Sequence, residues 1–188
     1  DLAGNADHCD TYVIVQDNNH NCGNPGFISV SGALKTAQTD GVEEGNVNVT
    51  GQPVTFAPPF SMFDMSDNTG AFNFQNNVPL AQSMTITPEK DDNPLNGVTT
   101  YDLVLISKHI LGIEPLNGAY NMIAADANKS NSITTFDIVE LRKLILGIYQ
   151  ELPANTSWRF VDKAQVFTNP ANPFQDVIRE NISVSQAL

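Results

Sequence analysis

A segment that occurs twice constrains the fold of this chain more than any other sequence feature. Residues 97–113 and 132–148 lie 35 positions apart, and nine of the 17 aligned residues are identical. Each copy starts near a Thr-Thr pair, continues with apolar residues and ends in Ile-Leu-Gly-Ile. A match of this length indicates an internal duplication, so we expect the same local structure twice.

Both copies carry the start and stop signals of a helix. Thr99 and Thr134 are good N-cap residues, and Gly112 and Gly147 suit the left-handed position after the last turn. The residues between them are apolar nearly all round, which is typical of a helix that is buried on more than one side. Their apolar faces should therefore meet a β-sandwich, the C-terminal segment or a partner.

The residues before the second helix have the spacing of a calcium-binding loop. Such a loop takes side-chain oxygens from positions 1, 3 and 5, a backbone carbonyl from position 7 and a carboxylate from position 12. These positions are held by Asp126, Asn128, Ser130, Ser132 and Asp137. Position 6, which needs a positive φ, is Asn131. A capping box of Thr134 and Asp137 is the alternative, but it explains only two of these residues.

The first copy has a less regular version of this loop. Its candidate metal ligands are Asp91, Asn93, Asn96 and Asp102. Leu95 at position 5 has no side-chain oxygen, and Pro94 stiffens the turn. The first site is therefore weak or empty, or Asn96 replaces the missing ligand. A ligand set made only of oxygens favours Ca²⁺ over Zn²⁺, which prefers His and Cys, and over Mg²⁺, which keeps more of its waters.

Charge and motifs argue against several classes of protein. The chain has 9 Lys and Arg against 21 Asp and Glu, a formal net charge of −12, so it lacks the basic face of a nucleic-acid binder. There is no run of about 18 apolar residues that would span a membrane. Nucleophile elbow, HExxH and phosphate-loop motifs are also missing. We therefore expect a protein that is not an enzyme.

Strand and turn signals divide the chain into four segments. Residues 25–88 carry short β-like runs separated by Gly, Pro and Asn, which predicts a small β-sandwich. Residues 89–150 hold the repeat, and residues 1–24 and 151–188 are β-like. The runs that predict strands are 11–15, 27–30, 47–50, 54–56, 71–74, 83–87 and 158–161. The predicted fold class is multidomain α+β: a β-sandwich followed by an all-α module of duplicated calcium loops and helices, with β-like terminal segments.

The duplicated loop and helix at residues 89–150 resemble the dockerin module. That family has two calcium loops, each followed by one helix, and it binds a cohesin partner. The resemblance implies two calcium sites and partner contacts at loop positions 10, 11, 17 and 18. The candidate contact residues here are Tyr101, Lys108, Phe136, Arg142 and Lys143.

Two further segments resemble known modules. Residues 25–88 resemble a prealbumin-like sandwich of the CnaB or carboxypeptidase-regulatory kind. The residues that carry this resemblance are 28–32, 47–51 and 67–74. Residues 1–24 are similar to the last strand of an HYR-type immunoglobulin-like repeat. Together these resemblances imply a piece of a large modular surface protein like those of Bacteroidetes, secreted or displayed on the cell surface.

The two cysteines, Cys9 and Cys22, fit an oxidising compartment. A disulfide between them requires the chain to turn back, because the two Cα atoms must lie within about 7 Å. Otherwise each cysteine has lost a partner that lies in another domain.

The terminal segments suggest how copies of the chain could associate. A strand at residues 11–15 without obvious neighbours could complete the sheet of a second copy, as in donor-strand fibres. The favoured hypothesis is a non-enzymatic extracellular structural module stabilised by calcium, as a subunit or fragment of such a filament. Its partner would be another protein or a second copy, bound through terminal strands and apolar helix faces. The alternative is a dockerin-type adaptor that binds a cohesin-like partner.

Overall fold

The computed structural model describes residues 8–16, 26–53 and 58–185. The chain forms two compact units, each built from segments that are not consecutive in the sequence. The sandwich unit contains Cys9–Glu89, Phe160–Ala164 and Arg179–Leu188. The helical unit includes Lys90–Arg159 and Gln165–Ile178.

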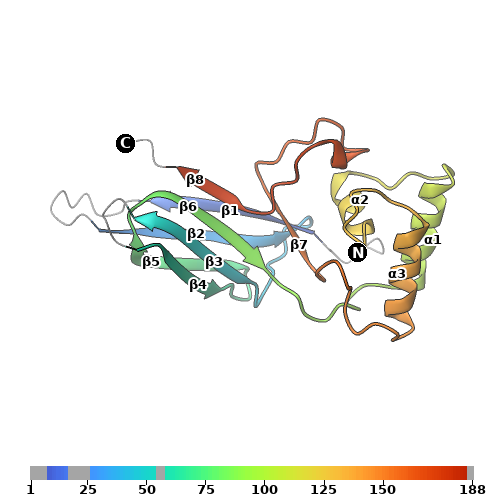
Figure 1. Cartoon of the computed structure of the whole chain (residues 1–188), viewed down its shortest axis with the longest axis horizontal. Helices are drawn as coiled ribbons and strands as arrows, with labels where there is room; N and C mark the ends of the chain where they lie inside the picture. The colour runs from blue at the N-terminus through green and yellow to red at the C-terminus, as the bar shows by residue number, and fades with distance from the viewer. Residues whose placement is uncertain (1–7, 17–25, 54–57, 186–188) are drawn as a thin grey trace. The chain divides into compact units, whose positions relative to one another are not determined.

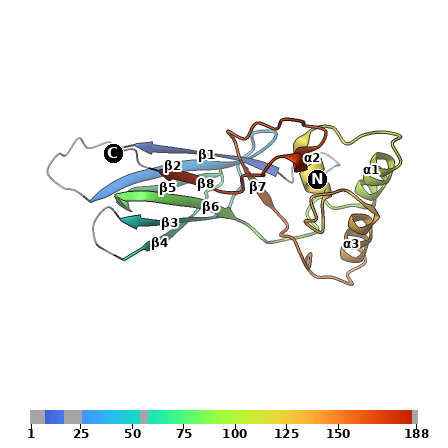
Figure 2. The same cartoon turned by 45° about the horizontal axis from the view of Figure 1, so that its top comes forward.

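The sandwich unit consists of two four-stranded sheets, shown as separate layers in Figure 2. One sheet has the order β5-β2-β1-β7 and the other the order β4-β3-β6-β8 (Figure 1). The strands are β1 His8–Gln16, β2 Phe27–Thr36, β3 Asn46–Pro53, β4 Phe60–Met65, β5 Ala71–Pro79, β6 Ala81–Glu89, β7 Arg159–Asp162 and β8 Ile182–Ser185. The pairings of β1 with β2, β2 with β5, β3 with β4 and β6, and β6 with β8 are antiparallel.

Alternation of side chains along the strands builds the core of the sandwich. Successive side chains of a strand point to opposite faces, so every second residue of β3 can be buried. Val47 and Val49 are fully buried in β3, and Ile86 is fully buried in the neighbouring β6. Phe72 and Phe74 of β5 add an edge-to-face ring pair with centroids 6.3 Å apart. Burial of such apolar area is the main stabilising contribution to this unit.

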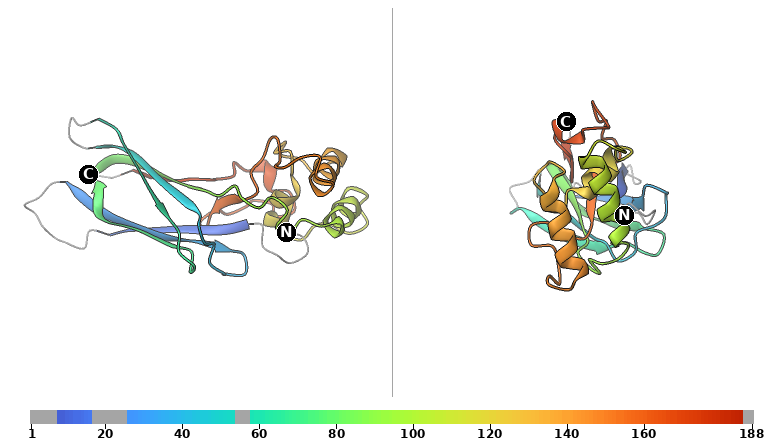
Figure 3. Two further views of the ribbon diagram at one scale, coloured as in Figure 1. Left: turned by 90° about the horizontal axis from the view of Figure 1, so that it is seen from below. Right: turned by 90° about the vertical axis from the view of Figure 1, so that its right-hand side faces the viewer.

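Three helices and one short 3-10 turn form the helical unit. They are α1 Thr100–Ile110, α2 Ala119–Ala125, α3 Thr135–Ile145 and η1 Pro173–Gln175. Figure 3 shows α1 and α3 side by side, and both contribute to one apolar core. Leu103, Ile106 and Leu141 are buried in this core, and Phe174 from the C-terminal segment packs against it. The core therefore joins the duplicated helices to residues that come after the repeat.

The predicted helix ends are confirmed. Thr99 and Thr134 are the N-caps of α1 and α3, and each forms a capping box with the aspartate three residues later. Gly112 and Gly147 follow the C-caps with φ of 67° and 68°. Only glycine adopts this left-handed backbone without steric cost, so local sequence determines both ends of each helix.

The predicted fold class is wrong. The sequence predicts a sandwich followed by an all-α module, whereas the chain is mostly β, with eight strands in two sheets and only three short helices among the described residues. The segments that flank the predicted sandwich supply β1, β7 and β8 to these sheets. β7 and β8 join sheets whose other strands lie far earlier in the sequence, and such pairing has no local signature that would predict it.

Most of the predicted strand runs do lie in strands. Residues 11–15, 27–30, 47–50, 71–74 and 83–87 fall inside β1, β2, β3, β5 and β6, and the run at 158–161 overlaps β7. The run at 54–56 lies outside the described residues. The sequence did not predict β4 or β8. Within the described part of the chain, no helix is both long enough and apolar enough to cross a membrane.

Candidate metal centre

The second loop, residues 126–137, connects α2 to α3. Asp126 is the C-cap of α2, and Thr134 is the N-cap of α3. Two residues between them have positive φ, Lys129 at 55° and Asn131 at 61°. Asparagine tolerates this region better than most residues, as the spacing predicted for position 6. The loop therefore turns tightly between the two helices.

The carboxylate of Asp126 lies inside this turn. Its Oδ1 accepts a hydrogen bond from the backbone N–H of Ser130 at 2.8 Å, and its Oδ2 accepts one from the N–H of Asn131 at 2.8 Å. The N–H of Ser130 also donates to Asn128 Oδ1 at 3.1 Å. Oxygens from loop positions 1 and 3 thus share one backbone donor, which places them on the same side of the loop.

The remaining predicted ligands of the second loop join the same network. Ser130 Oγ lies 3.1 Å from Ser132 Oγ and donates to the Ser132 carbonyl oxygen at 3.2 Å. Asp137 Oδ1 accepts from the N–H of Asn128 at 3.2 Å, while its Oδ2 accepts from the N–H of Thr134 at 2.8 Å. The structure therefore brings all five predicted residues of this loop together.

Burial and charge make this loop electrostatically unusual. The side chains of Asp126 and Asp137 are both 0% exposed. Burial raises the pKa of Asp126, and the nearby charge of Asp137 raises it further, against the lowering effect of hydrogen bonds from Asn131 and Ser130. The Arg159 guanidinium lies 3.9 Å from Asp126 Oδ2. Two buried carboxylates in one loop are costly unless a cation or further donors compensate them.

The first loop, residues 91–102, follows a different path. Positive φ occurs at Asn93 (45°) and Gly97 (79°), which are loop positions 3 and 7. Pro94 has no N–H to donate, and Leu95 has no side-chain oxygen, so the bonds of the Ser130 hydroxyl have no counterpart at Leu95. Asp91, Asn93 and Asn96 are exposed. The structure thus does not reproduce the second loop at these three predicted ligands.

Asp102 is the exception in the first loop. Its side chain is 4% exposed, and Oδ2 accepts from both the N–H and the hydroxyl of Thr99, at 2.7 and 2.8 Å. Oδ1 is buried and has no hydrogen-bond partner within the described residues. An unpaired buried polar atom costs about 1–3 kcal/mol, and more when it is charged. A bound cation is the kind of partner that would satisfy this oxygen.

The two loops differ in how well their residues suit a metal ion. Nowhere in the described ranges do three His, Cys, Asp or Glu side chains gather at one point. The second loop instead offers two carboxylates together with amide, hydroxyl and carbonyl oxygens. Ca²⁺ accepts this mixed oxygen set, whereas Zn²⁺ prefers nitrogen and sulfur ligands. The residues of the second loop therefore fit calcium, and Asp102 is the residue of the first loop that fits it best.

The predicted partner-binding residues lie on the surface of α1 and α3. Tyr101 is 55% exposed and Phe136 70% exposed. Lys108 pairs with Glu114 at 2.8 Å, and Arg142 is exposed. Lys143 pairs with Glu140 at 3.2 Å and lies over the ring of Tyr149, 4.9 Å from its centroid. Lys108 and Lys143 are therefore already paired within the helical unit.

Sequence reasoning missed most of an apolar surface around these residues. Large hydrophobic side chains are exposed at matching positions of the two copies, in pairs 35 residues apart. The pairs are Tyr101 with Phe136, Val104 with Val139, Leu111 with Leu146, and Ile113 with Ile148. The duplication itself was the signal that could have identified them, because equivalent positions in two equivalent helices share their exposure.

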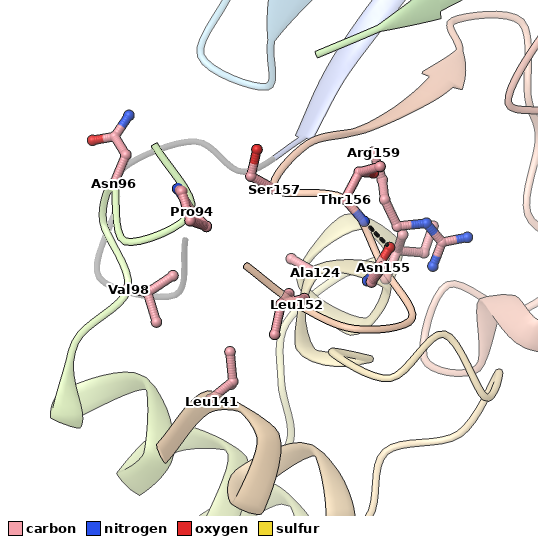
Figure 4. Close-up of a pocket in the computed structure, with 11 residues that line it drawn as sticks. Pro94, Asn96, Val98, Ala124, Leu141, Leu152, Asn155, Thr156, Ser157 and Arg159 are labelled. Carbon is pink, nitrogen blue, oxygen red and sulfur yellow. Dashed lines mark hydrogen bonds between the residues drawn. The ribbon is translucent and has the colours of Figure 1, made fainter. Parts of the chain in front are cut away.

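The segment 155–159, called the strap below, was also missed. It lines a small pocket of the helical unit together with Pro94, Asn96 and Val98 of the first loop and Leu141 of α3 (Figure 4). Asn155, Ser157 and Arg159 contact the two loops, although they lie outside the repeat. No feature of the sequence links these residues to the loops.

The predicted disulfide stays a prediction. Cys9 is the second residue of β1 and is paired in register with Thr36 of β2. Cys22 lies outside the described residues.

No family model, curated protein or solved structure matches this chain.

Proposed function

We propose that this chain is a non-enzymatic structural module of a secreted or cell-surface protein, and that calcium stabilises it. The observation that carries the proposal is the pair of fully buried carboxylates, Asp126 and Asp137, in one loop with the oxygens of Asn128, Ser130 and Ser132. A divalent cation would offset both charges and accept the remaining oxygens as ligands.

The proposed extracellular location would suit this use of calcium. Extracellular calcium-binding modules typically bind with dissociation constants of about 10⁻⁴–10⁻³ M, so even a modest site is useful where calcium is abundant. Because the loop assembles only in the folded chain, the free energy of metal binding adds to folding stability. The buried Oδ1 of Asp102 supports a second, weaker contribution from the first loop.

Thermal melting in calcium and in EDTA tests the proposal. At calcium concentrations about 100 times the dissociation constant, binding should stabilise the protein by about 2.7 kcal/mol, which EDTA would remove. Asp126→Asn keeps the side-chain shape but removes a ligand charge, so it should remove most of the difference between the two buffers and leave only the weaker contribution of the first loop.

Asp67→Asn is the matched control for this test. Asp67 also accepts hydrogen bonds from backbone N–H groups, those of Thr69 and Ala71, but it lies in a turn of the sandwich unit. This variant should keep the full calcium effect. A wild-type protein that melts at the same temperature in calcium and in EDTA would contradict the proposal.

Assembly into a filament by strand exchange belongs to the same proposal. In the described structure β1 pairs with β2, and β8 pairs with β6. Exchange would therefore move one of these strands from its own sheet into that of a second copy. Electron microscopy of native material should show fibres. A variant without residues 1–22 that remains folded, soluble and monomeric would count against exchange of β1.

A dockerin-like adaptor is the second candidate function. The repeated exposed pairs on the helices favour it, because a surface of this kind typically marks an interaction site. Pull-down from the native extracellular fraction should retrieve a cohesin-like protein with the wild type, but not with Phe136→Asp. Val177→Asp, at an 86% exposed residue outside the repeat, is the control. Equal retrieval by both variants would argue against this surface.

A further inference from the structure

The strap, residues 155–159, contacts position 1 of both loops. The backbone N–H of Ser157 donates to Asp91 Oδ1 at 2.8 Å, in the first loop. The side-chain amide of Asn155 donates to the backbone carbonyl of Asp126 at 3.0 Å, in the second loop. The Arg159 guanidinium lies 3.9 Å from Asp126 Oδ2. Three residues within a stretch of five thus contact the first ligand position of one loop or the other.

Other bonds hold the strap in one conformation against the first loop. Ser157 Oγ donates to the Asp92 carbonyl at 2.9 Å. Within the strap, the Thr156 hydroxyl donates to the Trp158 carbonyl at 2.5 Å, and the Thr156 N–H donates to Asn155 Oδ1 at 3.0 Å. The last of these bonds is drawn in Figure 4. The strap is therefore a folded turn whose contacts reach both loops at once.

The partners of the strap are groups that a metal ion would fix in place. A ligand at position 1 is held by the ion, whereas without the ion the buried carboxylates of Asp126 and Asp137 repel each other. The carbonyl of Asp126 belongs to the same residue as its carboxylate, so motion of the ligand also moves the acceptor of Asn155. In the first loop the N–H of Ser157 donates to the carboxylate of Asp91, an exposed residue, so the strap contacts that loop through a side chain.

We propose that residues 155–159 form a calcium-responsive strap, which closes on both loops when they hold calcium and which strengthens calcium binding in return. This inference rests on the proposed calcium sites and assigns Asn155 as a positioning residue of the second loop. Linkage makes the effect reciprocal: if calcium favours the closed strap by a given factor, the closed strap raises calcium affinity by the same factor.

The single tryptophan of the chain offers a direct probe of this movement. Trp158 lies inside the strap, between two residues that contact the loops, and the chain has no other tryptophan. Titration of the full chain with CaCl₂ should change Trp158 emission with the midpoint that calorimetry gives for calcium binding. Hydrogen exchange at residues 155–159 should be slower in calcium than in EDTA, by about five-fold if one hydrogen bond is gained.

Asn155→Ala tests the strengthening of calcium binding. Loss of one hydrogen bond to Asp126 should weaken calcium binding about five-fold. The variant should lose more thermal stability in calcium than in EDTA, which a purely structural role would not produce. Asn121→Ala is the control, because Asn121 also donates from its side-chain amide to a backbone carbonyl, that of Asn117 at 2.8 Å, and both residues lie outside the two loops.

The outcomes separate this inference from the proposed function. Calcium binding by calorimetry with no change in Trp158 emission or exchange would overturn the strap and leave the calcium site standing. Wild-type affinity in Asn155→Ala would overturn its positioning role. No calcium binding at all would overturn both proposals. If Asn155→Ala fails to fold, emission and exchange of the wild type still decide the question.

Discussion

Two aspartates at position 12 of the loops show how identical residues can differ in their environment. Asp102 and Asp137 both cap a helix through Oδ2, with Thr99 and Thr134 as donors. Their other oxygens differ, because Asp137 Oδ1 accepts from the N–H of Asn128, whereas Asp102 Oδ1 is buried without a partner in the described structure. The capping box therefore explains one oxygen of each carboxylate, and the second oxygen remains available for a metal ion.

Asp102→Asn should show whether this second oxygen binds calcium. Asparagine can still accept the hydrogen bonds of Thr99, so in EDTA the variant should melt within about 0.5 kcal/mol of the wild type. In calcium it should be less stable than the wild type by about 1–3 kcal/mol, because a ligand charge is lost. Scanning calorimetry in the two buffers measures the difference.

Thr99→Ala is the control for Asp102→Asn. It removes the hydroxyl of the cap but no candidate metal ligand, so it should cost about 1 kcal/mol in either buffer. If Asp102→Asn also costs the same in both buffers, Asp102 serves only as part of the cap.

At the scale of the element, features set by neighbouring residues in the sequence could be predicted. Pairings between strands that lie far apart in the sequence could not. Thr99, Thr134, Gly112 and Gly147 mark the helix ends because caps depend on residues within one turn. That the five predicted ligands of the second loop lie together could be anticipated for the same reason, since they fall within 12 residues of the sequence.

Other elements carry weaker signals. The α2 helix has seven residues and an N-cap, Gly118, that makes no side-chain capping bond. The β8 strand has four residues and is defined by its pairing with β6, about 100 positions earlier in the chain. The contacts of the strap with the loops also depend on tertiary structure. Such features require the neighbour that stabilises them, so a reading of local sequence cannot find them.

Substitution of two leucines near the end of α3 tests which side of this region is buried in the core. Leu144 is 1% exposed, whereas Leu146 is 66% exposed. Leu144→Ala should therefore lower the free energy of unfolding by about 2–5 kcal/mol, through lost burial and the cavity that remains. Leu146→Ala should change it by less than about 0.5 kcal/mol. Urea denaturation measures both, and equal losses would contradict the described packing of α3.

At the scale of the whole molecule, each compact unit combines segments from distant parts of the sequence. The sandwich unit takes strands from before and after the repeat, and the helical unit adds residues 165–178 to it. Tyr120 of α2 meets Phe167 of that later segment edge to face, with ring centroids 6.0 Å apart. Under the proposed function, two bound calcium ions would offset four of the 12 excess negative charges.

Removal of residues 182–188 tests whether the distant C-terminal strand stabilises the sandwich. β8 pairs with β6 from Ser83↔Ser185 to Ile86↔Ile182, and Ile182 and Val184 are half-buried. Its loss would leave the N–H and C=O groups of β6 unpaired along an open edge, which favours association with other chains. We expect a loss of about 1–3 kcal/mol in stability, from a few hydrogen bonds and two partly buried side chains.

Removal of residues 186–188 alone leaves β8 intact and is the control, which should cost little stability. Melting temperature and light scattering measure the two effects. A truncated protein that melts and scatters like the wild type would show that β6 does not need this partner.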